Sequence, residues 1–98
     1  MTIYRPQWLT DMEVARGEMD EEVRAARNRY FLKAAALAHS PRETLKSLAS
    51  DAGIHYHLII ATFRPDHSRI SAEMVLKIER TVGKDVLPCR ILRPDLFD

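Results

Sequence analysis

The chain has 98 residues, of which 46% are hydrophobic, and a formal net charge of +1. This length suits one small domain with a modest core. The near-neutral charge argues against binding nucleic acid through bulk electrostatics, although a dimer can still read bases with a few well-placed groups. The sequence has no apolar run of about 18 residues and no signal-peptide pattern, so we expect neither a membrane span nor secretion.

The single cysteine, Cys89, has no internal partner for a disulfide. Its interpretation is a small buried apolar residue, because a lone buried thiol is more often structural than reactive. Sparse cysteine use favours a cytoplasmic protein over a secreted one.

Residues 1–18 are expected to form an N-terminal arm, because Pro6 and Gly17 interrupt helix formation. Within the arm, Thr10 is predicted to cap a short helical turn over 11–16. The arm carries two large side chains, Tyr4 and Trp8. We expect them to dock the arm either onto the chain's own core or onto a partner chain.

The domain is predicted to cover 19–98 and to begin with a long helix over 20–38, whose acidic first turn suits the helix dipole. Steps of three and four residues predict a buried stripe of Val23, Ala26, Tyr30, Ala34 and Leu37. The opposite side is expected to face solvent and carries Arg24, Arg27, Asn28 and Lys33.

The next helix is predicted to run to Ala52, with Ser40 as its cap, Pro41 at its first position and Glu43 completing a capping box. A further helix is expected over 55–63. The spacing of a small residue, a glycine four positions later and inward aliphatic residues beyond it is typical of a helix-turn-helix over about 44–64. The residues that carry this pattern are Leu45, Leu48, Ala49, Gly53, Ile54 and Ile59.

The last helix is predicted to start after Ser71 and to end at Gly83, with Val75, Ile78 and Val82 on its buried face. The tail after it contains two prolines, so we expect it to be extended, with a short strand near Val86 or over 90–92. The fold class is therefore all-α, with four to five helices, an N-terminal arm and an extended C-terminal tail.

The second half of the chain resembles the Cro-like, YdaS-type regulators of phages and prophages over about residues 28–98. The matching residues occur in order and are Ala72-Glu73, Ile78-Glu79-Arg80, Gly83, Val86 and Leu92-Arg93-Pro94-Asp95-Leu96-Phe97. The resemblance implies a lambda-repressor-like fold and a transcriptional regulator, a Cro-like repressor, that binds a short operator in double-stranded DNA as a homodimer. It also implies pairing with a toxin gene, as in an antitoxin-like repressor.

In such a unit the second helix enters the major groove and the flanking segments meet the backbone. The predicted base contacts are His55, Tyr56, His57, Ile60 and Ala61. The predicted phosphate contacts are Arg42, Lys46, Arg64, Ser68, Arg69 and Ser71.

A different class of function remains open. The second helix is apolar in its middle, where Leu58 and Ile60 form a ridge that suits a protein partner. In that interpretation the scaffold is an interaction module that has lost specific DNA readout and binds another protein through this ridge or through the N-terminal arm.

Neither a catalytic constellation nor a cofactor motif is present, so we expect no enzyme and no cofactor. His55 and His57 lie two positions apart, which makes them diverge on a helix, and we therefore predict no metal site.

Overall fold

The computed structural model describes residues 3–40, 42 and 44–97, and all regular structure within them is helical. The elements in chain order are α1 (Gln7–Arg16), α2 (Glu21–His39), α3 (Leu45–Ala52), α4 (Tyr56–Ala61), the 3-10 helix η1 (Pro65–His67), α5 (Ala72–Val82) and α6 (Cys89–Leu92). The all-α prediction is confirmed, with more helices than expected. None of the helices described is long and apolar enough to cross a bilayer.

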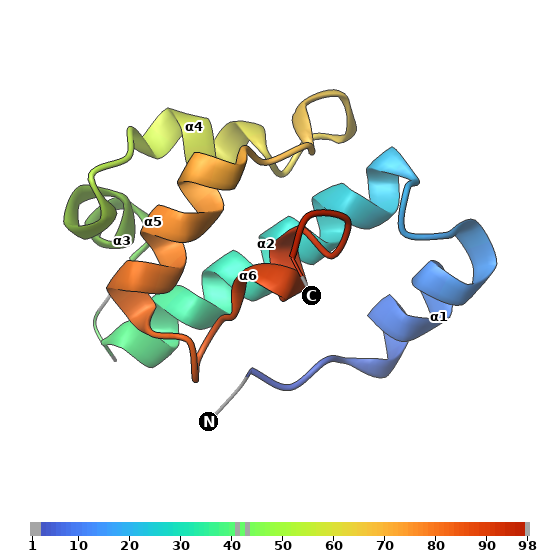
Figure 1. Ribbon diagram of the computed structural model, residues 1–98, viewed down its shortest axis with the longest axis horizontal. Helices are drawn as coiled ribbons and strands as arrows, with labels where there is room; N and C mark the ends of the chain where they lie inside the picture. The colour runs from blue at the N-terminus through green and yellow to red at the C-terminus, as the bar shows by residue number, and fades with distance from the viewer. Residues whose placement is uncertain (1–2, 41, 43, 98) are drawn as a thin grey trace.

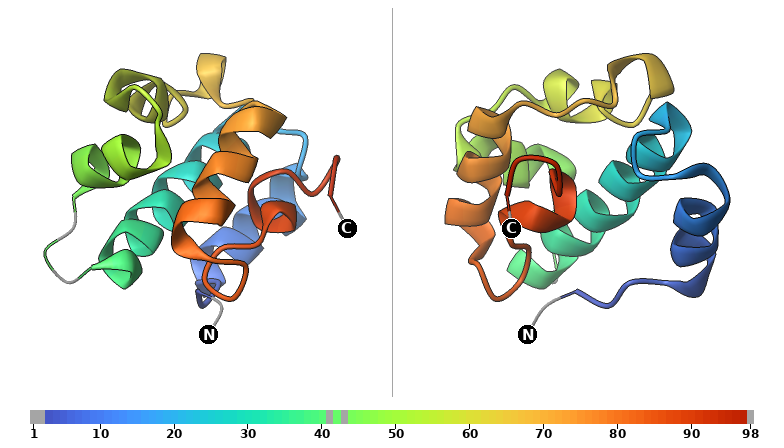
Figure 2. Two further views of the ribbon diagram at one scale, coloured as in Figure 1. Left: turned by 60° about the vertical axis from the view of Figure 1, so that its left-hand side comes forward. Right: turned by 45° about the vertical axis from the view of Figure 1, so that its right-hand side comes forward.

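Helix α2 runs through the middle of the molecule (Figure 1). Helices α1, α3, α5 and α6 and the η1 segment all contact it, whereas α4 packs mainly on α3. The core lies where these elements meet and includes the fully buried Phe31 and Leu32 of α2, Ile59 of α4 and Ile78 of α5. The turned views place α4 and α1 on opposite sides of α2 (Figure 2).

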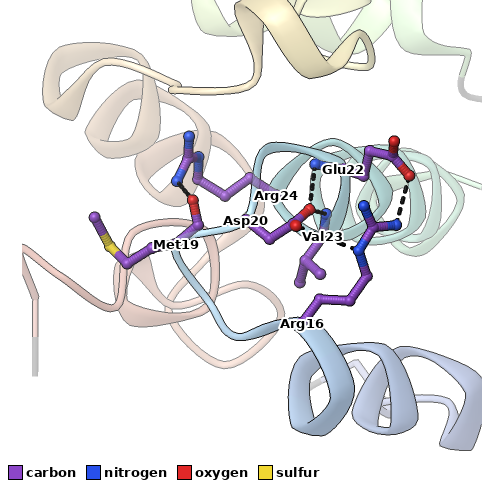
Figure 3. A network of polar contacts seen from close by, with 6 residues as sticks. All are labelled: Arg16, Met19, Asp20, Glu22, Val23 and Arg24. Carbon is purple, nitrogen blue, oxygen red and sulfur yellow. Dashed lines mark hydrogen bonds and ion pairs between the residues drawn. The ribbon is translucent and has the colours of Figure 1, made fainter.

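Asp20 sets the start of α2, as its position in the sequence suggests. Its carboxylate accepts hydrogen bonds from the backbone N–H groups of Glu22 and Val23 at 2.8 and 3.2 Å, and it also pairs with Arg16 at the end of α1 (Figure 3). Desolvation raises the pKa of Asp20, but these backbone donors and Arg16 outweigh it, so that the net shift is downward. The cap therefore joins α1 to α2 as well as ending the turn between them.

The prediction of which side of α2 is buried is wrong. Val23 is buried, but Leu37 is 62% exposed, and Arg27 and Asn28, expected in solvent, are each 1% exposed. The residues actually buried on this helix are Val23, Ala25, Arg27, Asn28, Phe31, Leu32, Ala35 and Ala36. Apolar residues occur on most sides of this helix between positions 30 and 38, so periodicity alone does not decide which side meets the core.

Helix α3 begins later than predicted. Its N-cap is Thr44, whose hydroxyl accepts a hydrogen bond from the Ser47 N–H at 3.3 Å. Ser40 instead follows the end of α2, where its own N–H donates to the carbonyl of Ala36. The predicted capping partners Pro41 and Glu43 lie outside the described residues.

The C-terminal tail is helical and turned where an extended segment was expected. Of the two positions predicted for a strand, Val86 lies in a turn and residues 90–92 belong to α6. The first backbone N–H of α6, on Cys89, donates to the Glu79 carboxylate at 2.8 Å. Burial, and then the neighbouring Glu79, raise the pKa of the Cys89 thiol to about 11, in keeping with a structural thiol. Pro88 precedes α6 at a position where its missing N–H costs no helical hydrogen bond.

Helix α5 follows its prediction closely. The Ser71 hydroxyl accepts a hydrogen bond from the Met74 N–H at 3.1 Å, and the helix ends at Gly83, whose φ is 100°. Val75 and Ile78 are buried as expected.

The N-terminal segment forms a longer helix than the predicted turn. Thr10 lies inside α1, which begins directly after Pro6. The docking residue is Leu9, which is fully buried in the core, whereas Trp8 is half exposed and meets the edge of the Tyr30 ring at 5.9 Å. Tyr4 remains 77% exposed.

Leu9→Ala therefore tests whether α1 belongs to the folding unit. The substitution opens a cavity in the core, so we expect the free energy of unfolding to fall by about 2–5 kcal/mol in denaturant titration. Val14→Ala on the same helix is the control, because Val14 is 83% exposed and should change little. Equal stability of the two variants would show that α1 does not contribute to the core.

Candidate nucleic-acid interface

Helices α3 and α4 are held at a fixed turn by Gly53. Its φ of 72° lies in the left-handed region that a glycine adopts at little cost. The N–H of Ile54 then donates to the carbonyl of Ala49 at 2.8 Å, which closes the end of α3. Ala49 is almost fully buried, and the small side chain lets α4 lie close to α3. These are the features that the sequence spacing predicted.

The outward side of α4 is exposed. Ile59 points into the core and is 0% exposed, while His55, Tyr56 and His57 are exposed to solvent. A shallow hollow of about 400 Å³ lies on this side and is lined by Tyr56, His57, Ile60, Ala61, Arg64 and His67. We call these six residues the α4 surface.

Two predicted base-contact residues are only partly available. Ile60 and Ala61 are half-buried and form the apolar part of the α4 surface. His55 lies just before the helix, and its ring stacks on that of His57 with centroids 5.4 Å apart. The hydrogen-bonding groups are therefore concentrated at the N-terminal end of α4.

One cation contacts the N-terminal end of α4, and two more lie before α3 and after α4 in the chain. The Lys46 ammonium of α3 lies 5.5 Å from the centroid of the Tyr56 ring, a cation–π contact that links the two helices. Arg42 is exposed before α3, and Arg64 is exposed directly after α4. One acidic residue stands nearby, since Asp66 pairs with His67 at 3.4 Å.

Three predicted phosphate contacts lie elsewhere. Ser68 is 2% exposed, and its hydroxyl donates to the carbonyl of Pro65 at 3.0 Å. The Ser71 hydroxyl is engaged as the cap of α5, and its residue lines a separate hollow with His55 and Leu58. Arg69 lines a pocket with Arg93 and Asp95 and not the α4 surface.

Asn28 is the residue that sequence reasoning missed. Its side-chain amide, buried on α2, donates to the carbonyls of Thr62 at 3.0 Å and Ser68 at 2.8 Å. These carbonyls stand at the two ends of the segment that contains Arg64 and His67. An asparagine within a helical pattern gives no signal of such a long-range role, because its partners are backbone groups.

Within the described part of the chain, no three histidine, cysteine, aspartate or glutamate residues form a cluster suited to a metal ion. The chemistry of the α4 surface is that of hydrogen bonding, stacking and apolar contact, with cations at its edges.

Comparisons of the chain with protein-family models, with curated proteins and with solved structures found no match.

Asn28→Leu should loosen the segment over 62–68. The variant leaves two buried carbonyls without their donor, so we expect the free energy of unfolding to fall by at least about 2 kcal/mol. Amide hydrogen exchange over 62–68 should accelerate more than exchange in α1. The exposed neighbour provides the control, since Arg29→Gln should shift stability by less than about 0.5 kcal/mol. Unchanged exchange in Asn28→Leu would mean that other contacts hold the segment.

Proposed function

We propose that this protein is a DNA-binding transcriptional regulator that uses α3 and α4 as a helix-turn-helix and binds a short operator as a dimer. The observation that carries the proposal is the outward side of α4, which presents the exposed Tyr56 and His57 together with Lys46 and Arg64. The resemblance of residues 28–98 to Cro-like, YdaS-type regulators supports the same assignment.

The dimensions of α4 suit a major groove. Six helical residues span about 9 Å along the axis, and the groove is about 12 Å wide. With α4 in the groove, the hydroxyl of Tyr56 and the ring nitrogens of His57 meet base edges. Ile60 offers only an apolar contact, which suits the methyl group of a thymine.

The flanking cations serve as backbone contacts in this arrangement. Lys46 and Arg42 lie at the start of α3, the helix that crosses the backbone in a helix-turn-helix, and Arg64 follows the end of α4. Phosphate contacts of this kind position the protein without reading sequence. Ser68 is left out of the proposed contacts because its hydroxyl is engaged internally.

A second function has one observation in its favour. Leu58 is 43% exposed and lines a hollow together with Ile54 and Met74, next to the polar residues His55, Ser71, Glu73 and Lys77. If the protein is an interaction module, this hollow is where a protein partner binds.

Replacing Tyr56 and His57 together with alanine should weaken DNA binding at least about tenfold, because one good base contact contributes about 1–3 kcal/mol of discrimination. Ligand DNA is first selected from a pool of random duplexes with the intact protein, and affinities are then measured by mobility shift. Tyr4→Ala is the control, since Tyr4 is exposed and far along the chain from α4. Leu58→Gln, which adds no charge to α4, should leave DNA binding intact.

Two outcomes contradict the regulator. One is the absence of any enriched duplex or shift at low salt. The other is a double alanine variant that binds DNA normally while Leu58→Gln abolishes self-association or binding to a protein, which favours the interaction module.

The salt dependence of DNA binding should be shallow for a dimeric helix-turn-helix protein. The chain carries a net charge of +1, so few phosphates are neutralised, and each contributes about −0.9 to the slope of log K against log salt. We expect a slope on the order of −4 to −6, measured by fluorescence anisotropy across a salt series. A slope near zero would be incompatible with backbone contact by the proposed cations.

A further inference from the structure

A second polar site lies away from the α4 surface. A pocket of about 120 Å³ opens between the turn that joins α1 to α2, the residues just before α5 and the C-terminal tail. Its wall contains four arginines and two carboxylates, namely Arg24, Arg27, Arg69, Arg93, Glu18 and Asp95. It shares no lining residue with the α4 surface.

Arg27 is the unusual member of this wall. Its side chain is 1% exposed, yet its Nε and Nη2 atoms find no hydrogen-bond acceptor among the residues described. The nearest carboxylate oxygen, Oε2 of Glu13, lies 3.6 Å from Nη2, which is ion-pair range but too long for a hydrogen bond. Burial lowers the pKa of Arg27, with Glu13 and Glu18 opposing the shift. Buried donors without acceptors are costly, so Nε and Nη2 of Arg27 have hydrogen bonds to offer.

Two further arginines also have unused donors. Arg24 donates from Nη1 to the carbonyl of Met19 (Figure 3), but its buried Nε has no acceptor in the described part of the chain. Arg69 is exposed at the rim, and its charge reaches Asp95 without a hydrogen bond or ion pair to any described residue. Arg24, Arg27 and Arg69 thus all have donors for which no described residue supplies an acceptor.

The fourth arginine closes the pocket. Arg93 donates from Nε and Nη2 to both oxygens of Asp95, at 2.8 and 2.7 Å, and from Nη1 to the carbonyl of Ile70 at 2.6 Å. The hydrogen bonds to Arg93 lower the pKa of Asp95 to about 2, so this carboxylate is charged, and each of its oxygens already accepts one hydrogen bond from Arg93. Asp95 is thus a fixed part of the wall and does not satisfy Arg27.

We propose that the pocket binds a small tetrahedral oxyanion of the phosphate type, held by Arg27 and Arg24 from below and by Arg69 from the rim. Four guanidinium groups against two carboxylates leave a positive wall, and guanidinium groups match phosphate oxygens in hydrogen-bond geometry. The volume admits one such ion. This site is separate from the proposed DNA contact and does not depend on it.

Titration calorimetry of the full chain with inorganic phosphate, at constant ionic strength set with chloride, tests the proposal. We expect saturable binding that Arg69→Gln weakens at least about tenfold, the effect of losing one charge-assisted hydrogen bond. Arg27→Met should abolish binding. Arg80→Gln is the matched control, because it removes the same charge from an exposed position of α5 outside the pocket.

Glu18→Gln keeps the test decisive if Arg27→Met fails to fold. Glu18 is exposed, and its charge competes with a bound anion, so neutralising it should tighten phosphate binding. Absence of saturable heat, or binding that neither Arg69→Gln nor Glu18→Gln alters, would overturn the proposal. The proposal would also be overturned if Arg69→Gln lost DNA binding without a change in phosphate affinity. That result would show that Arg69 contacts a phosphodiester of DNA and not a free oxyanion.

Discussion

The burial of α2 on several sides is the constraint on which the rest of the structure depends. Four helices and η1 contact this one helix, and its Phe31, Leu32 and Ala35 are fully buried. Dense packing leaves each partner helix few allowed positions. The pairing of α3 with α4 is thus oriented by a helix that takes no part in the proposed contacts with DNA.

Two adjacent polar residues of α2 show opposite solutions to burial. The amide of Asn28 donates to two carbonyls that lie 34 and 40 positions later in the chain. Its burial therefore ties α2 to the segment over 62–68. Arg27 has a carboxylate at ion-pair distance but unused hydrogen-bond donors at its Nε and Nη2. Buried polar groups are nearly always satisfied in native proteins, so the second case directs attention to an external ligand.

The net charge of +1 does not describe how charge is distributed locally. Acidic residues of the first two helices are paired locally, as in the contacts of Arg16 with Asp20 and Glu22 and of Arg5 with Glu13. Basic residues gather instead at the pocket and beside α4. Local potential and not total charge governs the approach of an anion, so near-neutral composition is compatible with both proposed sites.

Local chemistry in the sequence was enough to predict the all-helical class, the acidic start of α2, the turn at Gly53 and the bounds of α5. Each depends on interactions within a few residues, such as the hydroxyl of Ser71 with the Met74 N–H. The same reasoning placed His55, Tyr56 and His57 outward, because burying Ile59 determines the direction of its neighbours on so short a helix.

Tertiary contacts decided the rest. Helix α2 has apolar residues on most sides, so only its partners determine that Leu32 is buried and Leu37 exposed. The tail became α6 because Glu79, ten residues earlier, supplies an acceptor for its first N–H. Ser68 and Arg69 are adjacent in sequence and were both predicted to meet phosphate. In the structure Ser68 is buried and its carbonyl accepts from Asn28, whereas Arg69 lines the rim of the pocket. These outcomes depend on groups that only folding brings together, and no spacing within the sequence encodes them.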